Sequence, residues 1–206
     1  MKRLRTVALL AREAGLSALR AGLLRNPAID LACVAVHRRL PSSEDAARGE
    51  RPEFAAFAST CRAAGVPLVE ADTRPLAKDL DFLDGEPPID LLVSVSWRYI
   101  LSPRALGRPA WGALNLHRGQ LPEYAGAEPV RRMIEDRRPD AVITAHLMVE
   151  EVDAGPILGT VHLPMGWDGV TPPAEHAEVV KRRLLPLYPR LLDLGVAALG
   201  ARHGDG

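Results

Sequence analysis

The stretch IDLLVSVSW, residues 89 to 97, decides the fold of this chain. Its apolar run is almost continuous, whereas a strand with one face in water alternates apolar and polar residues. A run of this kind is typical of a central strand that is covered on both faces. It therefore predicts a mostly parallel sheet with helices on both sides, an α/β fold.

Alternating strand and helix patterns surround this stretch. Short apolar or β-branched runs bounded by Gly, Pro and charged residues indicate strands, and apolar residues three and four apart indicate helices. We expect a single domain over residues 1–206, with Pro186 and Pro189 breaking or kinking its last helix. The expected strands cover residues 5–10, 30–37, 66–72, 90–96, 112–117, 141–149 and 156–165, and the expected helices 17–25, 52–65, 127–136 and 174–199.

Composition limits the classes of function. The chain has 206 residues, 47% of them hydrophobic, and its 26 basic and 26 acidic residues give a formal net charge of zero. Nucleic-acid and membrane-surface binding need a sustained excess of Lys and Arg, so we expect neither kind of partner. Small polar substrates stay open, and the oligomeric state is also open, with a homodimer among the alternatives.

Targeting and metal-binding signals are weak. The two cysteines, Cys33 and Cys61, have no metal-ligand spacing, so we expect reduced thiols and no metal site. The apolar run near the start is interrupted by Arg12 and Glu13, and we expect no run of about 20 apolar residues that could span a membrane. These features favour a cytoplasmic protein.

The stretch NLHRGQLPEYAG, residues 115 to 126, carries the first candidate site. In a strand, residues two apart face the same side, so Asn115 and His117 project together from the end of a strand. Ligands of open parallel sheets bind beyond the carboxyl ends of the strands, where this pair would lie. An amide beside an imidazole can hold a carbonyl oxygen as it becomes an oxyanion. Asn and His at a strand end are also common loop-capping groups. Asp153, in the turn sequence DAGP, adds a carboxylate that could orient the histidine, with Glu150 and Glu151 as alternatives.

Three spaced motifs resemble the folate-dependent formyltransferases, which include glycinamide ribonucleotide formyltransferase, the catalytic domain of methionyl-tRNA formyltransferase and the sugar N-formyltransferases. They are SWRYILSPRAL (96–106), NLHRGQLPEYAGAEPV (115–130) and ITAHLMVEEVDAGPIL (143–158). The resemblance implies a Rossmann-like formyltransferase fold, 10-formyltetrahydrofolate as donor, and a cis peptide before Pro122. It implies Asn115, His117 and Asp153 as the catalytic group.

The resemblance also implies further site residues. His146, seven residues before Asp153, would support the site. Trp97 is either a wall of the folate pocket or an ordinary core residue. The candidates for folate binding are Trp97, Arg98, Tyr99, Ile100, Leu101, Glu151 and Val152. The candidates for acceptor binding are Arg12, Glu13, Arg118 and Glu128, each of which could equally be surface charge.

Departures from the family pattern bear on the acceptor. Arg118-Gly119 follows the histidine where the family often has Pro-Ser or Pro-Gly. The first turn, AREAGLS (11–17), lacks the Gly/Ser/Asn-rich phosphate cradle of the glycinamide ribonucleotide enzymes, and VVKRRLLPLYP (179–189) offers no counterpart to their substrate-binding glutamate. With 206 residues, we expect no additional tRNA-gripping domain. We therefore expect an N-formyltransferase that acts on the amine of another small molecule. The alternative is a catalytically silent folate-binding or regulatory relative.

Overall fold

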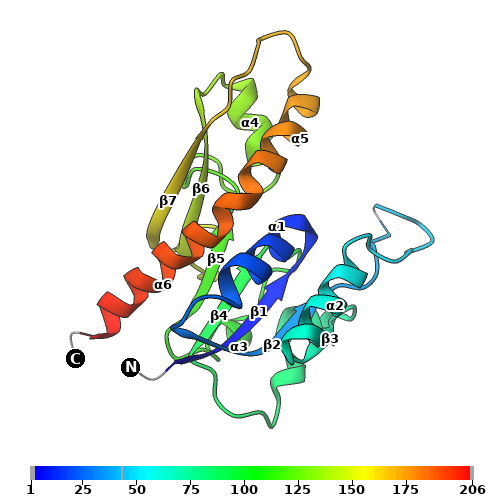
Figure 1. The fold of residues 1–206 in the computed structure, drawn as a ribbon, viewed down its shortest axis with the longest axis vertical. Coiled ribbons are helices and arrows are strands. Elements are labelled where there is room, and N and C mark those ends of the chain that lie inside the picture. The colour runs from blue at the N-terminus through cyan, green and yellow to red at the C-terminus, as the bar shows by residue number, and fades with distance from the viewer. Residues whose placement is uncertain (1–2, 43, 205–206) are drawn as a thin grey trace. The chain divides into compact units, whose positions relative to one another are not determined.

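The computed structural model describes residues 3–42 and 44–204, which divide into two compact units between Ala113 and Leu114. Each unit is described by itself. The expected single domain stays a prediction. Figure 1 labels the elements of both units.

The first unit is a parallel sheet with strand order β3-β2-β1-β4. Every residue of β4 is buried, as its apolar run predicts, and β1 pairs with β2 on one side and with β4 on the other. The strands are β1 (Leu4–Leu10), β2 (Ile29–Val36), β3 (Leu68–Glu70) and β4 (Leu91–Val95). The helical elements are α1 (Arg12–Ser17), a π-helical turn (Ala18–Leu23), α2 (Phe54–Ala64), a π-helical turn (Pro75–Asp79), a 3-10 turn (Asp81–Leu83) and α3 (Pro103–Leu106).

The first helical segment differs from its prediction. It begins at Arg12 instead of residue 17, and it continues as the π-helical turn that ends at Leu23. Gly15, which suggests a turn in the sequence, lies inside α1 because the helix approaches the end of β1 closely. A Cβ on Gly15 would lie 3.0 Å from the Cβ of Leu10, so a larger residue would push the two apart.

The second unit contains an antiparallel sheet, β5-β6-β7. β6 pairs with both β5 and β7 in the antiparallel sense. The elements are β5 (Ala113–His117), which starts at the last residue of the first unit, α4 (Pro129–Glu135), β6 (Asp140–Leu147), β7 (Ile157–Pro164), α5 (Pro173–Leu184), a 3-10 turn (Leu185–Leu187) and α6 (Tyr188–Gly204).

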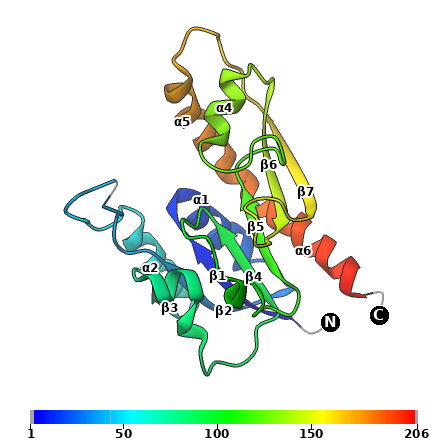
Figure 2. The same ribbon diagram turned by 180° about the vertical axis from the view of Figure 1, so that it is seen from behind.

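The last helical segment is interrupted where Pro186 was expected to break it. The 3-10 turn separates α5 from α6, because proline cannot donate the backbone hydrogen bond that an α-helix requires. Pro189 lies in the first turn of α6, where that donor is not needed. Figure 2 shows α6 running along β6 and β7, and α5 beside α4.

Part of the apolar surface of α6 is explained by its packing on the sheet of the second unit. By length and composition alone, the helical run Pro173–Gly204 is long and apolar enough to cross a membrane, but the core helix of a soluble protein passes the same test. Glycines let this helix lie directly on the sheet. A Cβ on Gly195 would lie 3.0 Å from the Leu114 side chain, and one on Gly159 would lie 3.2 Å from Leu194. Part of the apolar surface of α6 therefore packs within its own unit.

Candidate active site

Asn115 and His117 lie at the end of β5, as their spacing predicts. Antiparallel pairing places His146 of β6 opposite Asn115, and Thr144 opposite His117. Side chains of directly paired residues in an antiparallel sheet lie within contact distance of each other. The strand register therefore brings two histidines and an amide together before any loop contributes.

Asp153 completes this cluster from the turn between β6 and β7. Its Oδ2 lies 3.3 Å from His117 Nδ1, and its Oδ1 lies 3.4 Å from His146 Nε2. Asn115 Nδ2 lies 3.1 Å from the same His146 nitrogen. We call these four residues the candidate cluster. The structure thus brings the three residues of the expected catalytic group together and places His146 beside them.

The turn that carries Asp153 has a restricted backbone. Asp153 is in the left-handed region with φ 57°, which aspartate tolerates better than most residues. Gly155 follows, and a Cβ on this residue would lie only 1.8 Å from the carbonyl oxygen of Leu147. The Leu147 amide donates to the Pro156 carbonyl at 3.0 Å, which holds the turn against β6. Glycine at position 155 therefore sets where the carboxylate lies, a role that the sequence did not reveal.

The candidate cluster is largely buried, and burial shifts the pKa values of its ionisable groups. The side chains of His117 and Asp153 are 9% and 10% exposed. Burial lowers the pKa of His117 below its ordinary value, although the Asp153 carboxylate and the Tyr124 carbonyl raise it. For Asp153, burial raises the pKa, but the hydrogen bonds from His146 and the Gly126 amide and the charge on His117 together lower it below its ordinary value. The site therefore favours an ionised carboxylate beside a histidine that is not easily protonated.

The loop after β5 closes around His117. His117 Nε2 lies 2.9 Å from the carbonyl oxygen of Tyr124, and the Gly126 amide donates to Asp153 Oδ2 at 2.8 Å. The peptide bond between Leu121 and Pro122 is cis, which confirms the prediction. The contacts of Tyr124 and Gly126 were not predicted from the sequence, although both residues lie within the stretch 115–126.

The folate-binding candidates fall in both units. In the first unit, Trp97 stacks on His37 with ring centroids 4.0 Å apart, and its indole donates to the Ala77 carbonyl at 2.9 Å. Arg98 donates to the Tyr99 hydroxyl at 2.9 Å, and Arg98 Nη1 is buried without a hydrogen-bond partner among the described residues. Exposure differs among the remaining candidates: Ile100 is 63% and Val152 50% exposed, Glu151 is exposed, and Leu101 is buried.

The acceptor candidates differ in their contacts. Arg12 pairs with Glu44 at 3.0 Å on the surface, and Glu13 is exposed. Glu128 accepts from Lys181 at 3.3 Å. Arg118 is half-buried, and none of residues 3–42 and 44–204 forms a hydrogen bond or ion pair with its guanidinium. Its charge is close enough to lower the pKa of His117, after the larger effect of burial.

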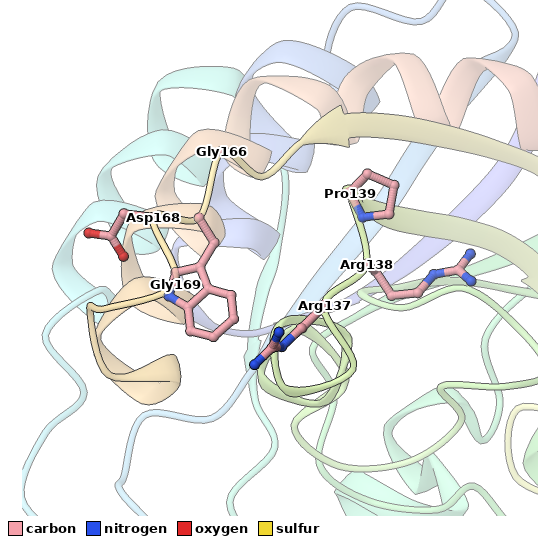
Figure 3. A pocket seen from close by; sticks show the side chains of 7 residues that line it. Arg137, Arg138, Pro139, Gly166, Asp168 and Gly169 are labelled. Carbon is pink, nitrogen blue, oxygen red and sulfur yellow. The ribbon is translucent and has the colours of Figure 1, made fainter.

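A cavity of about 500 Å³ lies elsewhere in the second unit, between the α4–β6 turn and the loop after β7 (Figure 3). The side chains of Arg137 and Arg138 diverge from that turn, and the Asp168 side chain points away from both. The Asp168 carboxylate accepts from the amides of Val170 and Thr171 at 2.9 and 2.8 Å, so its negative charge is already stabilised by the loop. Among the described residues, no group of His, Cys, Asp and Glu side chains is arranged to hold a metal ion.

Comparison with known proteins points to one family. Residues 50–181 match the model of the formyl transferase family. A methionyl-tRNA formyltransferase of Thermotoga neapolitana is 36% identical over 93 residues, which are 45% of this chain and 29% of that protein. One of Thermotoga maritima is 30% identical over 127 residues, which are 62% and 38% of the two chains. The chain thus spans about a third of the length of these relatives.

Solved structures have the same fold. Glycinamide ribonucleotide transformylase 1 of Symbiobacterium toebii superposes with a TM-score of 0.73 at 22% identity, covering 97% of this chain and 89% of that one. A formyltetrahydrofolate deformylase of Pseudomonas syringae pv. tomato superposes with a TM-score of 0.72 at 21% identity, covering 98% and 62%. These likenesses confirm the predicted Rossmann-like α/β fold.

Proposed function

Because the chain belongs to the formyl transferase family, we propose that it moves a formyl group from 10-formyltetrahydrofolate to the amine of a small molecule. The observation that carries this proposal is the buried cluster of Asn115, His117 and Asp153, with His146 beside it. Burying a carboxylate between two imidazoles costs free energy unless all of its polar atoms have partners, and such clusters are common at functional sites. In this family the use that fits such a cluster is acyl transfer.

The chain's own residues supply the polar groups that this reaction needs. Asn115 Nδ2 has two hydrogens, and only one of them can point to His146, so the other is free to donate to the formyl oxygen as negative charge develops there. His117 supplies a proton at the same place, and Asp153 keeps its ring oriented. Asp153, or a water that it orders, takes the proton that the attacking amine loses. The donor supplies the formyl carbon, to which the amine nitrogen forms a bond. When the bond to the folate nitrogen breaks, the formyl oxygen returns its proton to His117, and the proton taken from the amine passes to the folate nitrogen, which leaves as an N–H group.

Two segments are the proposed contacts of the folate donor. The buried Arg98 Nη1 without a partner fits a polar group of a bound pteridine, since an unpaired buried donor is costly. The exposed Ile100 and Val152 supply apolar surface of the kind that ligands cover. Trp97, Tyr99, Leu101 and Glu151 complete the proposed set, each to be tested by its own variant.

A small-molecule acceptor is proposed on the basis of charge. The 26 basic and 26 acidic residues cancel, whereas a tRNA substrate is usually met by a surplus of Lys and Arg. The unpaired guanidinium of Arg118, next in sequence to His117, would suit an acceptor that carries a carboxylate or phosphate. Arg12, Glu13 and Glu128 are weaker candidates, because Arg12 and Glu128 already have partners and Glu13 is exposed.

A single-turnover experiment tests the proposal. The protein is mixed with 10-formyltetrahydrofolate and either no amine, an aminosugar nucleotide, a free amino acid or methionyl-tRNA, and the loss of the donor is followed. We expect loss that depends on a small amine and that is abolished in His117→Ala. Loss only with methionyl-tRNA would refute the small-molecule acceptor, and loss without any amine would indicate hydrolysis. Donor binding without any loss would support the silent relative.

A further inference from the structure

Both ring nitrogens of His117 face hydrogen-bond acceptors. Nε2 lies 2.9 Å from the main-chain carbonyl of Tyr124, and Nδ1 lies 3.3 Å from Asp153 Oδ2. Of these two contacts, the one between Nε2 and the Tyr124 carbonyl is shorter and is the one with hydrogen-bond geometry. A carbonyl oxygen can only accept, so this bond requires a hydrogen on Nε2. In a neutral imidazole, which has one N–H, Nδ1 is then the nitrogen without a hydrogen.

The Tyr124 carbonyl belongs to a loop that is anchored at both ends. We call residues 120–126 the strap. The Tyr124 hydroxyl donates to Asp136 Oδ2 at 2.9 Å, and Arg138 donates to the Gln120 side-chain oxygen at 3.0 Å. Arg132 donates to the Ala125 carbonyl, and its guanidinium lies 5.7 Å from the centre of the Tyr124 ring. In Figure 3 the Arg138 side chain points away from that of Arg137, and of these two arginines it is Arg138 that binds the strap through Gln120.

Close packing holds the strap against His117. A Cβ on Gly119 would lie 2.8 Å from both His117 Nε2 and the Tyr124 carbonyl oxygen, so the chain passes directly beside this hydrogen bond. The buried Thr144 hydroxyl donates to the Gly119 carbonyl at 2.7 Å, which holds that segment to β6. The carbonyl thus has little room to turn away from the ring.

We propose that Tyr124 and Asp136 are positioning residues that hold His117 in its Nε2–H form, which leaves Nδ1 as the nitrogen that gains and loses the proton in formyl transfer. This inference rests on the proposed function for its catalytic consequence. When the ring is protonated, the added proton at Nδ1 is stabilised by Asp153. This is the proton that His117 gives to the formyl oxygen and takes back when the folate nitrogen leaves, and its departure leaves the ring in the same neutral form. No ring rotation is then needed between turnovers.

Substitutions at the two anchor residues test this role. Tyr124→Phe removes only the hydroxyl. Asp136→Leu removes the carboxylate that accepts from this hydroxyl, and because Asp136 is exposed, the variant should still fold. We expect each to lower kcat by roughly 10-fold to 10²-fold, as a misplacement of about 1 Å does, while KM for the donor stays within a few-fold. Asp136→Asn should restore most of the rate, because its amide oxygen can still accept from the phenol. Glu135→Gln, at the adjacent exposed residue that ends α4, is the matched control and should leave kcat unchanged.

Nitrogen-15 NMR of the histidine rings supplies a readout that does not depend on activity. Above the pKa of His117, the wild-type ring should show the Nε2–H form, and Tyr124→Phe and Asp136→Leu should add the Nδ1–H form. A wild-type ring in the Nδ1–H form would overturn the proposal, and so would variants with wild-type tautomer ratios and wild-type kcat. If the tautomers shift as expected but the wild-type protein transfers no formyl group, the proposed function fails and the positioning role stands.

Discussion

Replacing Gly155 with alanine should inactivate the site without a direct change to any residue of the candidate cluster. The new Cβ would lie 1.8 Å from the Leu147 carbonyl oxygen, whereas real Cβ contacts are essentially never shorter than 3.0 Å, so the turn must move by at least about 1.2 Å. Asp153, two residues earlier, holds His117 and His146 at 3.3 and 3.4 Å, and a shift of this size breaks both contacts. We expect kcat to fall by about 10²-fold.

The same substitution should cost only modest stability. The clash and the weakened hydrogen bond between Leu147 and Pro156 are confined to one turn, and overpacking of this kind costs about 1–3 kcal/mol. Circular dichroism and thermal unfolding would confirm that the fold persists, and steady-state kinetics would give kcat and the KM for the donor. Gly200→Ala is the matched control, because nothing lies within 4 Å of its new Cβ. A folded Gly155→Ala protein with wild-type kcat would refute this account of the turn.

Three further predictions concern single side chains. His117→Ala and Asn115→Ala should each lower kcat by roughly 10²-fold to 10³-fold with donor affinity within a few-fold, measured by kinetics and donor titration; loss of donor binding with turnover retained would make the segment a binding loop. Asp153→Asn removes a carboxylate that raises the pKa of His117, so that pKa should fall further and the limb of the pH–rate profile that reports His117 should move to lower pH; an unmoved limb would contradict the assignment. Burial lowers the pKa of His37 from 6.5 to about 4, so the unfolded chain binds more protons between these values, and the free energy of unfolding should drop by up to about 3 kcal/mol as pH falls through that window. Urea unfolding at several pH values measures the drop, and His37→Gln should flatten it.

The sequence predicted those features that depend on side-chain periodicity. The buried run of β4 and the shared face of Asn115 and His117 follow from the strand period of two. The break at Pro186 follows from its missing backbone donor. The start of α1 was predicted wrongly, because Gly15 suggests a turn in the sequence but serves a close helix–strand contact in the structure.

Contacts made by the main chain were outside the reach of sequence reasoning. The Tyr124 carbonyl faces His117, and the Gly126 amide donates to Asp153. Every residue type has a main-chain carbonyl, and every type except proline has a main-chain N–H, so the sequence does not show which of them form such contacts. Such a contact is visible in the sequence only where it requires a residue without a side chain. Gly119 and Gly155 are of this kind, since a Cβ on Gly119 would lie 2.8 Å from the Tyr124 oxygen, and one on Gly155 would meet the Leu147 oxygen at 1.8 Å. The glycines beside a candidate catalytic group are therefore as informative about its geometry as the polar residues themselves, and substituting them tests the placement of the group apart from its chemistry.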